Sequence, residues 1–379
     1  MKKLFFVVLL FVMFLTGCGL KTNNEIYNKV YNVDMDLSQI DEVLVPAVEK
    51  GSEATLGICV YSRRTLIQEW QVVSVGSCVV YDAKCVLEDG SVIDYKESFE
   101  KENIKYYQYK AITNSHVLSK ENAFMKYTIY DGKNNFSTEL QILGRDSSID
   151  LAVVSFESSV LYIPIEFANM DEVKKGQIVV AIGNANGLDY YSSATMGIIS
   201  YPKRLTEENG IMMEYIQHDA AINPGNSGGS LINIEGKLLG INTSKIVDDE
   251  IDSMGFAIPI DLIQQVLERL ENGEKISKQS TGVYGQTVNQ IKLNAILNNE
   301  TFDASLYGNY EYGFVVEKNL NSGVLSKYLI KNDILLEVDG EKIISTDILE
   351  FLIRYLKKDD IISIKVLRNG NVNDIEINV

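Results

Sequence analysis

The stretch Asn-Pro-Gly-Asn-Ser-Gly-Gly-Ser occupies residues 223–230, between two apolar, strand-like runs at 212–222 and 231–242. Glycine lets a backbone adopt positive φ angles and turn its N–H groups inward. Such N–H groups can bind a developing oxyanion beside the hydroxyl of Ser227. A glycine-rich hairpin turn that happens to contain serines is the alternative interpretation. The rest of the chain has to decide between a nucleophile loop and a simple turn.

A serine hydroxyl is a weak nucleophile at neutral pH, so Ser227 would need a general base within hydrogen-bonding distance. The chain contains only two histidines. His116 ends an apolar run, where a strand would deliver its side chain into a cleft. His218 lies on the run that leads into residues 223–230. We therefore predict that His116 is the base and that His218 is a wall residue.

An imidazole base also needs a carboxylate that orients it. Asp150 stands at the head of the apolar run 151–154, where a buried carboxylate is costly unless it is hydrogen-bonded. An imidazole N–H would satisfy that carboxylate and would fix the tautomer that leaves the other ring nitrogen free as a base. Asp219 competes with Asp150 by its position. A plain strand-capping role is the other interpretation of Asp150.

The chain order His116, Asp150, Ser227 is that of the chymotrypsin-type serine peptidases. Together with the motifs around it, the span from about residue 54 to 270 resembles that family, and within it the HtrA (DegP-like) branch. The motifs are TNSHV at 113–117, DLAV at 150–153, AIGN at 181–184, GIIS at 197–200, residues 219–229, GINT at 240–243 and GFAIP at 255–259.

The resemblance implies a role for each of these residues. His116 would be the general base and acid, Asp150 its orienter and Ser227 the nucleophile. The backbone N–H groups of Gly225 and Ser227 would form the oxyanion hole. No cofactor and no metal ion is expected.

The resemblance also implies a specificity pocket with Ala221 at its base. Its walls would come from Ile241, Asn242, Thr243 and Phe256. Because no acidic residue stands at the base, we expect the pocket to accept small or medium aliphatic side chains.

Short strand-like runs dominate residues 54–259, and such a pattern favours a barrel or sandwich over alternating strands and helices. We expect a mainly β fold, with two six-stranded antiparallel β-barrels over 51–272. The polar segment 82–105 is expected to be a surface hairpin or loop insertion. A helix is expected from residue 260 to about 270, closed by Asn272 and Gly273, before a linker at 273–280.

Residues 281–379 form a smaller unit that resembles a PDZ domain through 282–285, 321–324, 329–335 and 338–343, although a glycine usual in the third motif is absent. The resemblance implies a small α+β domain that binds C-terminal peptides as an added strand. Val283, Tyr284 and Gly285 would bind the peptide carboxylate. Helices are expected at 323–329 and 345–356. A PDZ-like spacer that binds nothing is the alternative.

The N-terminus has Lys2 and Lys3, then an apolar run at 4–15 that is too short to span a membrane comfortably. Residues 15–18, Leu-Thr-Gly-Cys, resemble the lipobox of bacterial lipoproteins. The resemblance implies a signal peptide at 1–17 and a lipid anchor on Cys18, followed by a tether and short helix over 18–50. The protein would be exported and anchored on the extracytoplasmic side of the cell membrane. An ordinary signal peptide is the alternative.

The 379 residues carry 52 acidic and 35 basic side chains, a net charge of −17, which disfavours nucleic acid and other polyanionic partners. Cys59 and Cys78 lie in apolar runs and are expected to be buried. A Cys78–Cys85 disulfide is left open. No CxxC motif or histidine–cysteine cluster with metal-ligand spacing is present.

The resemblance therefore implies an HtrA-type serine endopeptidase of protein quality control, which cleaves misfolded or exposed-chain proteins in the cell envelope. Its partners would be protein and peptide substrates and copies of itself, with a trimer expected from the family. Two alternatives stay open. One is a chaperone or PDZ-based stress sensor with an idle protease fold. The other is a regulatory protease with a restricted substrate.

Overall fold

The computed structural model describes residues 38–65, 67–118, 124–132, 138–185, 188–208, 211–244, 254–276 and 278–379. The predicted signal peptide, Cys18 and the tether up to residue 37 lie outside the described residues. The described chain is mainly β, with three sheets and few helices, which confirms the predicted fold class. No helix among the described residues combines the length and apolar character needed to cross a membrane.

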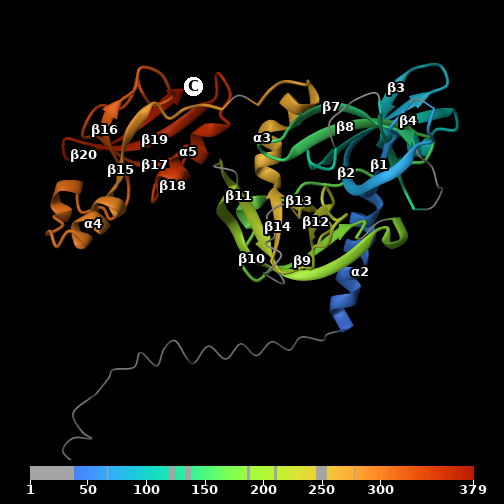
Figure 1. Ribbon diagram of the computed structural model, residues 1–379, viewed down its shortest axis with the longest axis horizontal. Coiled ribbons are helices and arrows are strands. Elements are labelled where there is room, and N and C mark those ends of the chain that lie inside the picture. The colour runs from blue at the N-terminus through green and yellow to red at the C-terminus, as the bar shows by residue number, and fades with distance from the viewer. Residues whose placement is uncertain are drawn as a thin grey trace, which may run out of the picture. The chain divides into compact units, whose positions relative to one another are not determined.

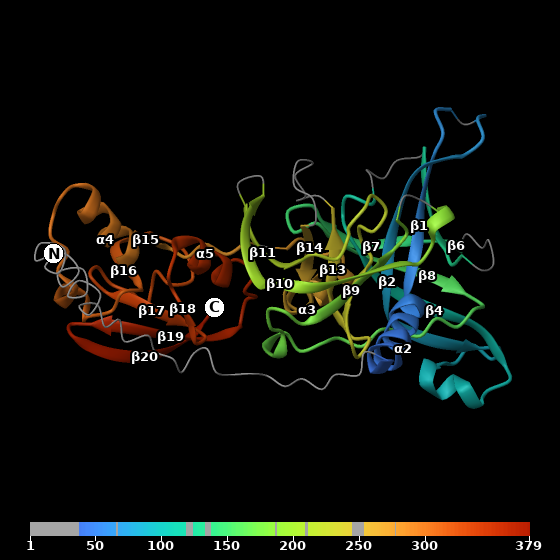
Figure 2. The ribbon, with the colours of Figure 1, turned by 90° about the horizontal axis from the view of Figure 1, so that it is seen from below.

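The first sheet has eight antiparallel strands in the order β6-β5-β1-β2-β4-β8-β7, with β3 paired to β2. Figure 2 shows the β1–β2 hairpin extending away from the rest of this sheet. The strands are β1 (Thr55–Ser62), β2 (Gln71–Leu87), β3 (Val92–Asp94), β4 (Ile104–Thr113), β5 (Met125–Tyr130), β6 (Thr138–Glu139), β7 (Gln141–Asp146) and β8 (Leu151–Ser158).

The polar segment 82–105 is the hairpin alternative rather than a loop. β2 continues through it to Leu87 and pairs with β4, while β3 and the short helix η1 (Tyr95–Glu100) fill the turn. The hairpin is ordered because Ala83, Cys85 and Leu87 are buried against the first sheet, beneath their charged neighbours. This extension and the short β6 give the sheet more strands than the six expected.

The second sheet is a closed six-stranded barrel in the order β10-β11-β14-β13-β12-β9, as predicted for residues 51–272. Its interior is filled by aliphatic side chains such as Val180, Ile199 and Ile241. The strands are β9 (Ile178–Gly183), β10 (Ser193–Glu208), β11 (Ile211–His218), β12 (Ser230–Asn233), β13 (Leu238–Thr243) and β14 (Gly255–Pro259). Short helices η2 (Met170–Glu172) and η3 (Leu188–Tyr190) lie in the connections.

Helix α3 (Ile260–Glu271) packs against strands of both sheets, β7 and β8 of the first and β13 and β14 of the second (Figure 1). Its buried face contains Ile263, Val266 and Leu270, the helical spacing seen in the sequence. Asn272 caps it and Gly273 follows at φ 68°, which confirms the predicted end of the helix. The short helix predicted within residues 18–50 is also present, as α2 (Ser38–Ala54).

The C-terminal unit is built on a third antiparallel sheet in the order β15-β16-β17-β19-β20, with β18 on β17. The predicted helix at 345–356 is α5, capped by the Ser345 hydroxyl. The elements are β15 (Val283–Thr287), α4 (Val288–Leu297), η4 (Ala304–Tyr307), β16 (Phe314–Asn319), β17 (Ile334–Val338), β18 (Glu341–Lys342), α5 (Thr346–Arg354), β19 (Ile361–Arg368) and β20 (Asn371–Asn378).

One helix prediction in this unit is wrong, and one helix was not predicted. Residues 323–329 form turns, because Gly323 sits at φ 128° and packs directly on Gly282, which bends the chain. Helix α4 was not expected. Its apolar residues include Leu293 and Ile296, which are more than half exposed, so its sequence lacks a single apolar face.

The cysteines Cys59, Cys78 and Cys85 are all buried and all free thiols. This confirms the expected burial of Cys59 and Cys78. No disulfide joins Cys78 to Cys85. Burial raises the pKa of the Cys78 thiol to about 12, so it stays protonated at neutral pH and packs as a small apolar side chain.

Candidate active site

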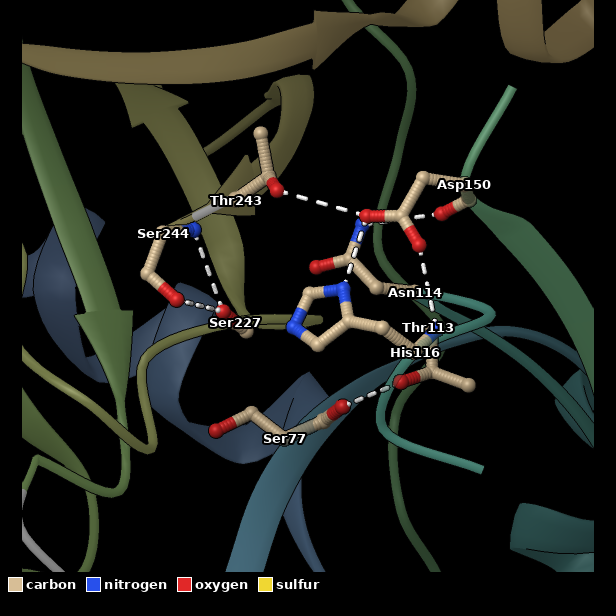
Figure 3. A network of polar contacts seen from close by, with 8 residues as sticks. All are labelled: Ser77, Thr113, Asn114, His116, Asp150, Ser227, Thr243 and Ser244. Carbon is tan, nitrogen blue, oxygen red and sulfur yellow. Dashed lines mark hydrogen bonds and ion pairs between the residues drawn. The ribbon is translucent and has the colours of Figure 1, made fainter. Parts of the chain in front are cut away.

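Asp150 immediately precedes β8 and points its carboxylate at His116 (Figure 3). Its Oδ2 lies 2.8 Å from the His116 Nδ1, and its Oδ1 accepts the His116 backbone N–H at 3.0 Å. The Thr243 hydroxyl donates to Oδ2 at 3.3 Å. Asp150 is only 3% exposed, and these bonds offset the cost of burying its carboxylate. The bond to Nδ1 favours the tautomer with its free nitrogen at Nε2.

The backbone on either side holds this pair in place. Asp150 adopts a left-handed conformation at φ 53°, which an Asp tolerates better than most residues. Its carbonyl accepts the backbone N–H of Ser115 and the side-chain amide of Asn114, both at 3.1 Å. These bonds join the turn after β4 to the start of β8. The two segments lie close together because β4 and β8 are neighbouring strands of the first sheet.

The imidazole of His116 is one-third exposed, and Figure 3 shows it lying between Asp150 and Ser227. Ser227 belongs to the loop before β12, so the second sheet supplies the serine while the first supplies the other two side chains. Among the residues that the structure describes, no hydrogen bond joins His116 to Ser227. The Ser227 Oγ instead contacts Ser244, with 2.7 Å between the two hydroxyls and 3.1 Å to the Ser244 backbone N–H.

Ser77 on β2 fixes the loop that carries Ser227. Its hydroxyl donates to the Gly225 carbonyl at 2.8 Å and accepts from the backbone and side-chain amides of Asn184 at 3.0 and 2.9 Å. Its own backbone N–H donates to the Ser227 carbonyl at 2.9 Å. Gly228 passes so close that an added Cβ would lie 2.0 Å from the Ser77 carbonyl oxygen. The loop is therefore clamped against the first sheet.

The clamp leaves the two backbone donors expected for an oxyanion hole available. Gly225 adopts φ 101°, in the range that favours glycine. Within the described part of the chain, neither the Gly225 N–H nor the Ser227 N–H has a protein acceptor. Neither donor is therefore committed to an acceptor among the described residues.

The residues expected to line a specificity pocket come from three elements. Ile241, Asn242 and Thr243 end β13 and are fully buried, and the Asn242 amide donates to the Ser230 carbonyl at 2.7 Å. Phe256 on β14 packs edge-on against Tyr215. Ala221 lies after β11, is exposed, and its carbonyl accepts the Thr195 hydroxyl.

The two competing candidates lie elsewhere. The Asp219 carboxylate accepts the Ile198 backbone N–H at 2.6 Å. It therefore joins the residue after β11 to β10 and does not orient a histidine. His218 is completely buried at the end of β11, where its ring would collide with any side chain at Gly255. Burial lowers the pKa of His218 to about 4, outweighing the attraction of Asp219. This is the wall position expected for it.

The residues expected to bind a peptide carboxylate lie on β15, which is an edge strand of the third sheet. Val283 is buried, whereas Tyr284 is largely exposed. Gly285 packs against the Val315 carbonyl, where no side chain would fit. The described residues contain no group of three or more histidine, cysteine or acidic side chains that could hold a metal ion.

Three residues of the site escaped prediction from the sequence. Ser77 binds the Gly225 carbonyl, Asn184 binds the Ser77 hydroxyl, and Ser244 contacts Ser227. Each contact joins residues that are far apart in sequence. The motifs that contain Asn184 and Thr243 were recognised, but not what these side chains bind. A serine between Gly76 and Cys78 gives no periodic signal, since only the packing of the two sheets brings it to Gly225.

Known proteins resemble this chain over most of its length. A family model described as a trypsin-like peptidase domain matches residues 76–241. A serine protease HtrA-like from Staphylococcus aureus (strain MRSA252) is 35% identical over 305 residues, which cover 76% of this chain and 37% of that protein. A serine protease Do-like HtrA from Lactobacillus helveticus is 30% identical over 300 residues, covering 76% of this chain and 70% of that protein. The chain thus spans little more than a third of the staphylococcal relative's length.

Two solved structures share the fold. One is the HtrA-type protease AlgW with a decapeptide, with a TM-score of 0.58 and 22% identity over 88% of this chain and 97% of that one. The other is the same protease with a tripeptide, with a TM-score of 0.57 and 24% identity over 88% and 96% of the two chains.

Proposed function

Because this chain belongs to the HtrA family of serine proteases, we propose that it is a serine endopeptidase that hydrolyses peptide bonds with Ser227, His116 and Asp150. The observation that carries the proposal is the 2.8 Å contact between the Asp150 Oδ2 and the His116 Nδ1, with Ser227 on the other side of the ring. Asp150 holds the imidazole in the tautomer whose Nε2 can take a proton.

In the first half of the reaction, the Ser227 Oγ attacks the scissile carbonyl carbon while its proton passes to the His116 Nε2. The negative charge that forms on the substrate oxygen is bound by the Gly225 and Ser227 N–H groups. His116 then gives its proton to the leaving amine, and an acyl-enzyme ester remains on Ser227. Water, activated by the same imidazole, hydrolyses that ester and restores the serine.

The site supports protein and peptide substrates with small or medium aliphatic side chains. Among the residues expected to line the pocket, Ile241 and Phe256 are apolar, and no acidic residue stands at its base, Ala221. One HtrA-type neighbour was solved both with a decapeptide and with a tripeptide, which supports peptide binding by this chain as well. We extend the proposal to misfolded or exposed-chain proteins, whose backbone is accessible to such a cleft, and so to a role in protein quality control and the stress response.

Casein cleavage by the wild type and by Ser227→Ala tests the enzymatic function. The wild type should release peptides, and Ser227→Ala should lose that activity by about 10⁶-fold because the nucleophile is gone. Equal activity in both proteins, or none in either, would contradict the proposal. The second result would favour the chaperone or stress-sensor alternative, which binds unfolded chains without cutting them.

For the C-terminal unit, the proposal is recognition of C-terminal peptides on the open edge of β15. That edge has backbone groups available for an added strand, and Val283, Tyr284 and Gly285 lie at its start. Isothermal titration with a peptide and with its C-terminally amidated form tests this. Binding that does not depend on the free carboxylate would contradict it. If casein cleavage needs such a peptide, the regulatory-protease alternative gains support.

Export and anchoring through Cys18 complete the proposal, and they rest on the lipobox-like sequence alone. Labelling of cells with a radioactive fatty acid should mark the wild type and not Cys18→Ser. The trimer expected from the family is checked by sedimentation velocity of the exported part.

A further inference from the structure

The contact between Ser244 and the nucleophile gives Ser227 two hydrogen-bond partners before any substrate binds. Ser244 directly follows β13, and its backbone N–H donates to the Ser227 Oγ at 3.1 Å. The two hydroxyl oxygens are 2.7 Å apart, a full hydrogen bond in either direction. Figure 3 shows Ser244 on the side of Ser227 that faces away from Asp150.

The chemistry of a hydroxyl makes this arrangement consequential. A serine hydroxyl has one proton and two lone pairs. If Ser227 donates to Ser244, its only proton points away from the base that must receive it. If Ser244 donates instead, the Ser227 oxygen accepts two hydrogen bonds, from the Ser244 N–H and the Ser244 hydroxyl, and both withdraw electron density from the nucleophile. In the first direction the hydroxyl contact has to break before an acyl-enzyme can form, and in the second direction it slows the attack.

We infer that Ser244 is a positioning residue that holds Ser227 in a resting arrangement and releases it for acylation. The inference rests on the proposed function of Ser227 as nucleophile. Two consecutive residues at the end of β13, Thr243 and Ser244, then contact two different members of the proposed triad. Thr243 donates to Asp150, and Ser244 restrains Ser227.

A merely structural role for the Ser244 hydroxyl has little support in the described residues. The side chain is half-buried, and its hydroxyl has no hydrogen-bond partner there other than Ser227. Removing it therefore leaves no buried donor or acceptor unpaired except the Ser227 hydroxyl, which becomes free to turn to His116. The backbone N–H of Ser244 is retained in any substitution other than proline.

The test measures labelling of Ser227 by a fluorophosphonate probe in the full-length protein. In that reaction the Ser227 Oγ forms a bond to phosphorus, the phosphorus–fluorine bond breaks, fluoride leaves and the serine proton passes to His116. A neutral hydrogen bond corresponds to a factor of about 2 to 12 in an equilibrium. We therefore expect Ser244→Ala to raise the second-order labelling rate constant by about 2- to 12-fold.

Controls separate a specific release from a general loosening. Ser244→Thr keeps the hydroxyl and should label within twofold of the wild type. Ser305→Ala, a matched change at a serine of the C-terminal unit whose hydroxyl contacts Asp303, should leave labelling unchanged. The thermal midpoint of Ser244→Ala should fall by no more than a few degrees, since only one hydrogen bond is lost.

A Ser244→Ala rate at or below the wild-type rate overturns the inference alone. So does acceleration shared equally by Ser244→Thr, or acceleration accompanied by a fall in thermal midpoint larger than the loss of one hydrogen bond explains. If neither the wild type nor any variant is labelled, the proposed function fails, and this inference fails with it.

Discussion

His116 and His218 both stand where a strand ends, His116 just after β4 in the first sheet and His218 as the last residue of β11 in the second. The His116 ring is one-third exposed and bonded to a buried carboxylate. The His218 ring is fully buried, and neither of its nitrogens has a hydrogen-bonding partner in the described part of the chain. The backbone near Ala220 and Phe256 favours its charged form slightly, and burial outweighs that effect.

The difference teaches what makes a histidine a base. An imidazole that accepts a proton needs a second partner to stabilise the cation, and Asp150 provides one for His116. His218 has no hydrogen-bonded carboxylate in the described part of the chain, and burial outweighs the attraction of Asp219, so its pKa falls to about 4 and it stays neutral at physiological pH. Residue type and strand-end position are the same in both regions, and the chemistry differs because the surroundings do.

The largest expected effect comes from exchanging the two rings for side chains that cannot carry a proton. His116→Ala should reduce casein hydrolysis by about 10⁶-fold, because Ser227 loses its general base. His218→Gln should leave kcat/KM within about threefold, since no hydrogen bond among the described residues joins its ring to His116, Asp150 or Ser227. Progress curves of fluorescent casein digestion, with matched protein concentrations, measure both.

Circular dichroism spectra of both variants provide the control, because each must be folded for the comparison to hold. A comparable loss of casein hydrolysis in the two variants would contradict the distinction between a catalytic His116 and a structural His218. It would then show that His218, or the wall it belongs to, participates in the reaction.

The next prediction tests Asp150, the hydrogen-bonded carboxylate that His116 has and His218 lacks. Asp150→Asn should lower kcat by about 10⁴-fold, the loss typical of this change in serine protease triads, because the amide favours the wrong imidazole tautomer. Asn also tolerates the left-handed backbone at φ 53°, so the turn should keep its shape. Burst kinetics with an activated ester substrate measure acylation directly. A variant with wild-type acylation would contradict the orienting role of Asp150.

Much of the arrangement that separates the two histidines could be predicted from sequence. Ser227, His116 and Asp150 stand in or beside motifs with strong local character, and each strand they border is an apolar run. The barrel around residues 178–259 was predictable for the same reason. Apolar runs of this kind predict strands well, because the same apolar side chains form the packed core of the folded protein.

What could not be predicted depends on contacts between distant segments. The Ser77 clamp and the Ser244 contact join residues 148 and 17 positions apart, across loops whose path no local pattern specifies. Helix α4 was missed for a different reason. Several of its apolar side chains face solvent, so helical spacing was absent although the Thr287 hydroxyl caps its start. The same limits apply to His218. Its position on the run that leads into residues 223–230 predicts a wall residue, but the sequence does not predict that its ring is buried.

The smallest expected effect is on stability and sharpens the contrast at β11. The pKa of His218 is about 4 in the folded protein against an ordinary value of 6.5, so unfolding takes up a proton between these pH values. Stability from this group is therefore present above pH 6.5 and is lost as the pH falls towards 4. Between pH 7 and 5 the loss should be about 2 kcal/mol, and His218→Gln should abolish it.

Glu214, four residues earlier on β11, is a matched control of opposite sign. Burial raises the pKa of its carboxyl to about 7 and outweighs the attraction of Lys203, so the folded state keeps a proton that the unfolded state releases above pH 4.5. Its contribution should grow by about 2 kcal/mol as the pH falls from 7 to 5. Urea unfolding in a Ser227→Ala background, which prevents self-digestion, should therefore give Glu214→Gln a steeper acid loss than the parent and His218→Gln a shallower one. Parallel curves of stability against pH for all three proteins would mean that burial shifts the pKa of neither His218 nor Glu214. The contrast between His218 and His116 would then rest on Asp150 alone.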